Sequence, residues 1–367
     1  LAASFRQRLS PAPRYVLLIG DASWNPRRLN PSDPAYGGDA ETDIVPTRLF
    51  ESSVDHLEAC SDNWFACVDG EDDLLPDLFV GRLPARTPAE ARQMVDKILA
   101  YHGEAAEHPA MGRAVFVAGL QEKDGDPNFE AESEKMISRF VPPHLAVQRI
   151  FVEQTGGDAA RNLIKDAFSE GALLVNFFGH GAVGIWTKLQ ILTSSMVGTF
   201  GRTAFPPFVF TMSCINGLFT DPRPENTSLA EALLNQDGRG AVAVFSGSGK
   251  AFPTPLYVVA DGLYTAFFQK GLTQIGTFCT AGLFNLRATY PAFDDHLLFY
   301  ILFGDPACPL RYDSDQFETH AGFAGQVRMG GGIPMRGKKL QARIAGETLA
   351  QTDLKTDNGI FGPLYLP

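Results

Sequence analysis

Two short apolar runs in the middle of the chain constrain its fold more than any other feature. Residues 172–178 break into Gly179-His180-Gly181, and residues 207–212 break into Ser213-Cys214. Continuous apolar runs of this length, partly β-branched and aromatic, are typical of strands buried in a parallel sheet. Ligands bind beyond the carboxyl ends of the strands in open α/β sheets, so His180 and Cys214 are predicted to meet at that edge.

The rest of the chain alternates between strand and helix patterns, which predicts an α/β fold with a mostly parallel sheet flanked by helices. Residues 104–112 are polar and would link two subdomains, residues 1–110 and residues 111–312. Residues 313–367 are Gly-rich with short alternating runs, and they predict a small β-rich domain or part of one.

A cysteine beside a histidine is the arrangement of a nucleophilic acyl-transfer site. The thiolate is the nucleophile, and a nearby imidazole can take the thiol proton and later protonate the leaving amine. The N–H groups of Gly181 and Cys214 would form an oxyanion hole. The alternative is that Cys214 is a small buried hydrophobe and that His180 is a structural histidine with satisfied hydrogen bonds.

An ordered set of motifs resembles the gingipain family of cysteine peptidases, in the caspase-like clan. It comprises the two strand ends and, in the same order as in the family, Tyr15–Asp21, Ser61–Trp64, Leu78–Arg82, Ser228–Leu233 and Phe303–Pro306. The resemblance covers roughly residues 13–312 and implies a caspase-like fold and cysteine endopeptidase activity. It also implies that the first subdomain lacks its start, and that residues 313–367 belong to an immunoglobulin-like domain.

The resemblance also suggests further site residues. Gln121, with Glu122 beside it, occupies the position of the family's third catalytic residue, a glutamate that would orient His180. A glutamine can orient an imidazole but cannot stabilise its charged form as a carboxylate does. Glu130, with Asp124 and Asp126 as neighbours, would bind a basic P1 side chain, although such acids also suit the first turn of a helix. Phe252 matches a tryptophan that covers the specificity pocket.

Two interpretations are open for Trp186 and for the acidic stretch between residues 55 and 77. Trp186 would either line the substrate site or fill core space. The acids Asp69, Asp72 and Asp73 would either belong to a solvated loop or hold a structural calcium ion, which the resembled family binds. No cofactor is expected for the chemistry itself.

Composition limits the partners that such a chain can have. The net charge of −11 argues against a nucleic-acid partner, and the sequence contains no apolar run long enough to span a membrane. The resemblance implies a peptide or protein substrate and a secreted or cell-surface location. The alternatives to hydrolysis are a sortase-like transpeptidase of a secretion system and a non-catalytic adhesion or scaffold module that keeps the fold.

Overall fold

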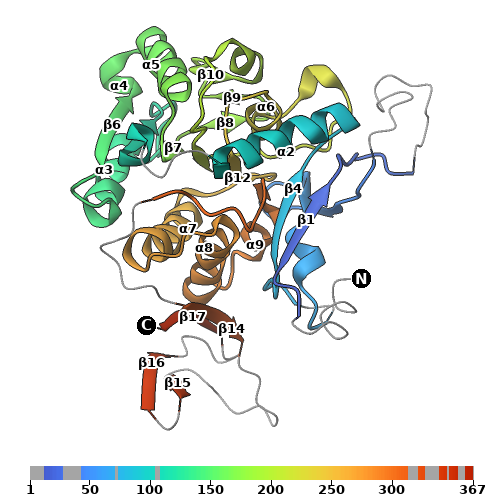
Figure 1. The fold of residues 1–367 in the computed structure, drawn as a ribbon, viewed down its shortest axis with the longest axis vertical. Helices are drawn as coiled ribbons and strands as arrows, with labels where there is room; N and C mark the ends of the chain where they lie inside the picture. Colours follow the sequence, from blue (N-terminus) through green and yellow to red (C-terminus); the bar gives the residue numbers. More distant parts are fainter. Residues whose placement is uncertain are drawn as a thin grey trace.

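A computed structural model describes residues 12–27, 43–70, 73–103 and 108–312, together with four strands within residues 321–366. Its centre is an eight-stranded sheet that contains strands from both predicted subdomains (Figure 1). In spatial order the strands are β1 (Tyr15–Ile19), β4 (Phe79–Leu83), β13 (Tyr300–Phe303), β12 (Ala243–Gly247), β11 (Phe208–Met212), β7 (Leu174–Phe178), β5 (Arg113–Ala118) and β6 (Ala146–Phe151). The subdomain boundary near residue 110 remains a prediction.

Neighbouring strands are parallel except for β12 and β13, which are antiparallel. The predicted mostly parallel sheet is therefore confirmed, and the antiparallel pair makes it a mixed sheet. The antiparallel pair reverses the direction of β13, β4 and β1 relative to the other five strands. As a result, β7 and β11 end at one edge of the sheet, and β1 and β4 end at the opposite edge.

Helices cover both faces of the sheet because the central strands are apolar on both sides. Helix α2 (Pro88–Gly103) and helix α6 (Leu229–Leu234) lie on one face, and α7 (Pro253–Tyr264) and α8 (Ile275–Thr289) pack together on the other (Figure 1). Successive side chains of a strand point to opposite faces. In β7, Phe177 accordingly stacks on Trp186, whereas the next residue, Phe178, packs edge-on against Tyr257 of α7.

The remaining elements are peripheral to this sheet. They comprise helices α3 (Phe129–Phe140), α4 (Val152–Thr155), α5 (Gly157–Glu170) and α9 (Asp294–Phe299), the hairpin of β2 (Arg48–Glu51) with β3 (Glu58–Ser61), and a small sheet of β8 (Gly181–Ala182), β9 (Ile185–Trp186) and β10 (Leu192–Thr193). Short 3₁₀ and π turns connect several of them. No helix among the described residues is long and apolar enough to cross a membrane.

The C-terminal part of the chain contains two antiparallel strand pairs, β14 (Ala321–Gln326) with β17 (Ile360–Leu366) and β15 (Lys339–Ile344) with β16 (Glu347–Asp353). These strands agree with a β-rich segment after residue 312, but they do not show the immunoglobulin-like fold that the resemblance implies.

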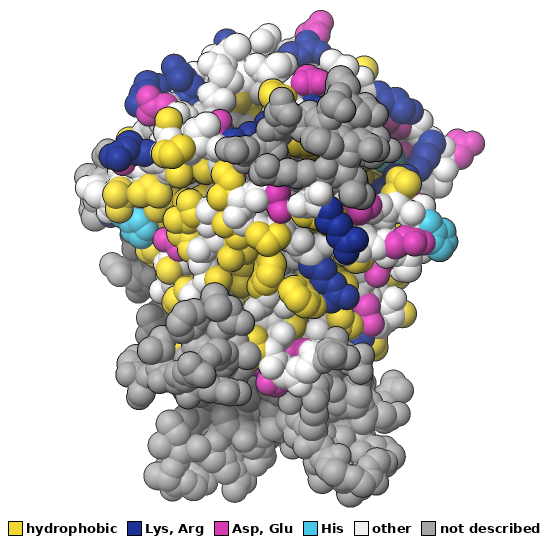
Figure 2. All heavy atoms as spheres, turned by 90° about the vertical axis from the view of Figure 1, so that its right-hand side faces the viewer, with side chains coloured by type: hydrophobic (Ala, Val, Ile, Leu, Met, Phe, Trp, Pro, Cys, Tyr) yellow, Lys and Arg dark blue, Asp and Glu magenta, His cyan; other side chains and the backbone are white. Residues whose placement is uncertain are grey.

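Strand β1 forms one edge of the central sheet, and its face carries apolar side chains. Leu17 and Ile19 of β1 are exposed, as is Ile44 beside the end of that strand. Figure 2 views the molecule from this side and shows hydrophobic side chains gathered there.

Candidate active site

The register of β7 and β11 brings His180 and Cys214 to the same edge of the sheet. Phe178 lies directly opposite Met212, and each of the two candidate residues follows two positions later. The Gly179 N–H donates to the Met212 carbonyl at 3.3 Å, which holds the two chains together just beyond the strands. The expected meeting of the two strand ends is therefore present in the structure.

The Asn216 side chain binds the backbone that follows His180. It belongs to the loop after β11, residues 213–217, which we call the cysteine loop. The amide nitrogen of Asn216 donates to the carbonyls of Ala182 and Ile185, at 2.5 and 3.1 Å. Its oxygen accepts a hydrogen bond from the buried Ser213 hydroxyl at 2.5 Å. Because Ser213 and Asn216 flank Cys214, these bonds fix the cysteine loop relative to the β8–β9 hairpin.

Gly181 lies where a side chain would not fit. A Cβ atom at this position would come within 2.9 Å of the Ser213 hydroxyl and 3.1 Å of the Cys214 carbonyl. Thr187 N–H donates to the carbonyl of His180, so Gly181 is a non-hydrogen-bonded position of its antiparallel pair with Trp186. The Gly181 N–H therefore points away from β9, as an oxyanion donor would require.

The imidazole of His180 is held by a carboxylate. Its Nε2 lies 2.8 Å from Oδ2 of Asp126, whose side chain is 4% exposed against 30% for the histidine. The same oxygen accepts the N–H groups of Glu122 and Lys123, at 2.9 and 3.0 Å. Burial acts to raise the pKa of Asp126, but these hydrogen bonds, led by the one to His180, leave that pKa below its usual value.

Asp126 therefore takes the position expected for Gln121 or Glu122. The Gln121 side chain donates instead to the Asp126 carbonyl at 2.9 Å, which steadies the loop. Glu122 accepts the Lys188 N–H at 2.8 Å and pairs with its ammonium group at 3.3 Å. The sequence marked Asp126 only as a neighbour of Glu130, because seven residues separate it from the end of β5. The available signal was the residue type, because an aspartate can accept backbone N–H groups within its own turn and is thereby held in place.

Cys214 lies in a partly buried position with basic groups near it. Its sulfur lies 3.8 Å from the carbonyl oxygen of Ala251. Burial raises the pKa of the thiol, and the charges of Lys250 and Lys123 partly oppose that shift. Lys250 in turn pairs with Asp55 of the β2–β3 turn at 3.0 Å.

The residue after the cysteine has a strained backbone. Ile215 has a φ angle of 48°, in the left-handed region that β-branched residues rarely adopt. Its N–H is bound by the Gly249 carbonyl at 3.2 Å, so contacts outside the loop hold this conformation. Strain of this kind gathers where a reactive group must be presented in one orientation.

The other predicted substrate residues have different environments. Trp186 is fully buried against Phe177, so the core-filling interpretation describes it and a substrate contact does not. Phe252 is 49% exposed and comes directly after Ala251, beside the thiol, which suits a cover for the site. Glu130 accepts the Glu153 N–H at 3.1 Å and the Gln154 amide at 2.8 Å, so both of its oxygens have local partners.

Within the acidic stretch, Asp73 supports the backbone of its own loop. Asp73 accepts the N–H groups of Asp69 and Leu75, both at 3.1 Å. Asp72 lies outside the described residues. Within the described part of the chain, no group of three acidic, histidine or cysteine side chains is placed to hold a metal ion. Calcium binding by Asp69, Asp72 and Asp73 remains a prediction.

Comparison with known proteins agrees with this geometry. The chain matches peptidase family C25 over residues 2–311. Gingipain R2 and gingipain R1 of Porphyromonas gingivalis are 24% identical to it over 313 residues, which is 81% of this chain but 38% and 28% of those proteins. The chain thus spans well under half of the length of these relatives.

Two solved structures share the fold. The Arg-specific cysteine proteinase gingipain R superimposes with a TM-score of 0.66 at 18% identity, covering 100% of this chain and 79% of that one. The complex of the pro- and mature domains of the P. gingivalis protein also gives 0.66, at 17% identity, covering 100% of this chain and 81% of that one. With the family match over residues 2–311, this similarity shows that the chain belongs to peptidase family C25, the family of the gingipains.

Proposed function

We propose that the chain is a cysteine endopeptidase in which Cys214 attacks the scissile carbonyl. The sulfur forms a bond to the carbonyl carbon, the amine leaves, and water then hydrolyses the thioester so that the thiol is regenerated. Burial keeps the free thiol largely protonated, so the proton must leave as the attack proceeds. His180 acts as the base in this step and as the acid that protonates the leaving amine.

Asp126 determines which nitrogen of His180 accepts and returns the proton. An ionised carboxylate only accepts hydrogen bonds, so Nε2 carries a hydrogen and donates it to Asp126. Nδ1 is then the nitrogen that receives the thiol proton. The charged imidazolium that results is stabilised by Asp126, whose low pKa keeps it ionised throughout. The negative charge on the substrate oxygen is bound by the N–H groups of Gly181 and Cys214.

The observation that carries this proposal is the His180–Asp126 hydrogen bond beside the matched ends of β7 and β11. A scaffold that merely keeps the fold does not need an ionised partner for this histidine, so the bond favours an enzyme. Hydrolysis and transpeptidation share the acyl-enzyme step and differ only in whether water or an amine removes the acyl group.

A basic P1 residue is the preferred substrate in this proposal, because the structural relative is described as Arg-specific. The expected carboxylate, Glu130, has local partners for both oxygens, so a substrate would have to displace one of them. Phe252 would cover the bound side chain. A peptide or protein substrate, a secreted or cell-surface location and structural calcium complete the proposal.

Labelling with peptidyl electrophiles tests the proposal. The series varies only P1 (Arg, Lys, Leu and Asp) and is applied to the parent protein, to Cys214→Ala and to Cys67→Ala, which removes another partly exposed thiol. Labelling of the parent and Cys67→Ala, strongest with Arg, is expected. Labelling that survives in Cys214→Ala would refute the nucleophile, and a preference for Leu or Asp would refute the basic pocket. Added amine nucleophiles then distinguish transfer from hydrolysis.

A further inference from the structure

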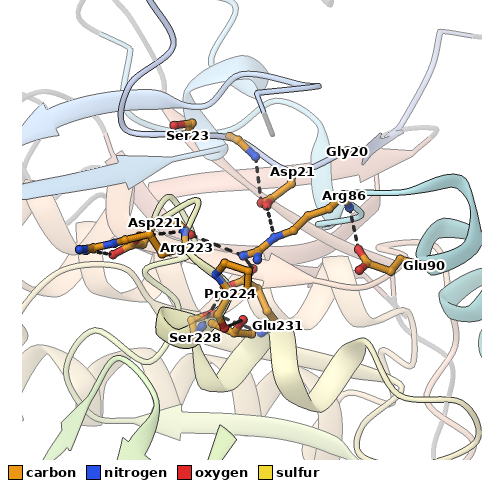
Figure 3. Close-up of polar contacts among 12 residues, drawn as sticks. Gly20, Asp21, Ser23, Arg86, Glu90, Asp221, Arg223, Pro224, Ser228 and Glu231 are labelled. Atoms are coloured by element: carbon orange, nitrogen blue, oxygen red, sulfur yellow. Dashed lines mark hydrogen bonds and ion pairs between the residues drawn. The ribbon is translucent and has the colours of Figure 1, made fainter. Parts of the chain in front are cut away.

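Three charged side chains form a buried cluster at the start of helix α6. Arg86 lies between two carboxylates, with its Nε 2.8 Å from Oδ2 of Asp21 and its Nη2 3.0 Å from Oε1 of Glu231 (Figure 3). The side chains of Asp21, Arg86 and Glu231 are 0%, 17% and 5% exposed. The cluster therefore joins the end of β1 and the segment after β4 to helix α6.

Glu231 also fixes the start of α6. Its second oxygen accepts the Ser228 N–H at 2.8 Å, and the Ser228 hydroxyl accepts the Glu231 N–H at 3.3 Å, which together form a capping box. The first two helical N–H groups bond to the segments that follow His180 and Cys214. Leu229 N–H donates to the Val183 carbonyl at 2.8 Å, and Ala230 N–H donates to the Asn216 carbonyl at 3.1 Å.

These two bonds connect α6 to the segments that follow β7 and β11 and carry His180 and Cys214, here called the catalytic loops. Val183 lies in the hairpin three residues after His180, and Asn216 lies two residues after Cys214. A shift of the α6 N-terminus would therefore move both catalytic loops together.

The charges of the cluster do not balance. Two carboxylates share one guanidinium, and the surrounding charges are already paired: Arg82 binds Asp62 at 2.6 Å, and Arg223 binds Asp221 at 2.5 Å. Glu90 adds a further acid, accepting the Arg86 N–H at 2.7 Å. Like charges held in a buried site disfavour full ionisation, which favours a proton on one of the two carboxyl groups.

We propose that Glu231 is a positioning residue of the peptidase site, and that the Asp21–Arg86–Glu231 cluster holds both catalytic loops in place only while one of its carboxyl groups is protonated. The inference rests on the proposed function, since it concerns the geometry of that site. Burial raises the pKa of both carboxyl groups, and for Glu231 the charge of Asp21 adds to the shift.

The sign of the effect follows from the raised pKa values. The folded protein binds more protons at the cluster than the unfolded chain does, so folding stability falls as the pH rises from the ordinary carboxyl range through the raised values. Loss of the last proton leaves an unpaired buried charge, which loosens the hold of α6 on the two loops. Activity should therefore have an alkaline limb that originates outside the dyad.

Glu231→Gln tests the proposal because glutamine keeps both the size and the capping acceptor. We would measure kcat/KM, thermal unfolding and the hydrogen-exchange protection of the Leu229 and Ala230 amides from about pH 5 to about pH 9. In the parent all three should decline toward alkaline pH, with kcat/KM falling up to about tenfold per pH unit at the limit. In Glu231→Gln the alkaline decline should shrink to about twofold or less.

Ser228→Ala is the matched control, because it weakens the same cap without removing a titratable group. It should lower the unfolding temperature at every pH and leave the alkaline limb in place. Profiles of Glu231→Gln that superimpose on the parent's would overturn the proposal. Unfolding and exchange need no catalysis, so they test the cluster even if Cys214 proves not to be a nucleophile.

Discussion

The Asp126 carboxylate lies 2.8 Å from Nε2 of His180, although 54 residues separate them in the chain. It comes from the loop after β5, and the histidine comes from the end of the neighbouring strand β7. In the proposed mechanism, this contact sets the tautomer of the His180 imidazole and stabilises its charged form.

Replacing Asp126 with Asn should reduce kcat/KM by about 10²–10⁴-fold. The amide keeps the size but is neutral, so it cannot stabilise the imidazolium. If its NH₂ group takes the place of Oδ2, it forces the hydrogen onto Nδ1 and loses the two backbone N–H bonds that this oxygen accepts. Steady-state kinetics and the ¹⁵N chemical shifts of His180 would detect the change. Gln121→Ala, which removes only a bond to the Asp126 carbonyl, should cost much less. Equal losses in the two variants would contradict the proposed role.

The pair of Asp55 and Lys250 should tune the reactivity of Cys214. Asp55 acts to raise the pKa of the thiol and Lys250 acts to lower it. Asp55→Asn should therefore move the midpoint of alkylation by iodoacetamide to lower pH, and Lys250→Met should move it to higher pH. The pH dependence of the alkylation rate measures both. Shifts in the same direction would show that the variants act by disturbing the loop instead.

Trp186→Phe should affect stability and leave substrate affinity alone. The indole is fully buried and stacks on Phe177 with ring centroids 4.3 Å apart. The smaller ring should cost about 1–2 kcal/mol of unfolding free energy through lost packing. Chemical denaturation gives this value, and KM is the accompanying readout. A raised KM at unchanged stability would restore the substrate-contact interpretation.

Phe252→Ala should show the opposite pattern. The side chain is 49% exposed beside the residue whose carbonyl faces the thiol. Little stability should be lost. KM for a substrate with a basic P1 side chain, which Phe252 would cover, should rise about fivefold to fiftyfold, the effect of losing one aromatic contact. Denaturation curves and Michaelis constants measured on the same preparation decide the point. An unchanged KM would remove Phe252 from the site.

Much of the secondary structure could be predicted from the sequence, because its local patterns are strong. Asn128 caps the start of helix α3 (Phe129–Phe140), and Ser228 and Glu231 form a capping box at the start of α6, both of which are local sequence signals. The two apolar runs form β7 and β11, and the glycine after His180 lies where only a glycine fits. These features depend on periodicity, capping and turn chemistry over a few residues.

Other features depended on contacts between distant parts of the chain. The sequence did not reveal that β13 lies between β4 and β12 and reverses the sheet, because strand order has no local pattern. It also named Gln121 and Glu122 as partners of His180, whereas the fold of the following turn presents Asp126.

The sequence by itself determined the strand and helix pattern, the family resemblance and the placement of His180 and Cys214 at the ends of two neighbouring strands. Only the tertiary structure decided the ionised partner of His180, the burial of Trp186 and the meeting of Asp21 with Glu231. The physical reason is that hydrogen bonds and charge pairs between distant segments depend on packing geometry, which short-range sequence patterns do not specify.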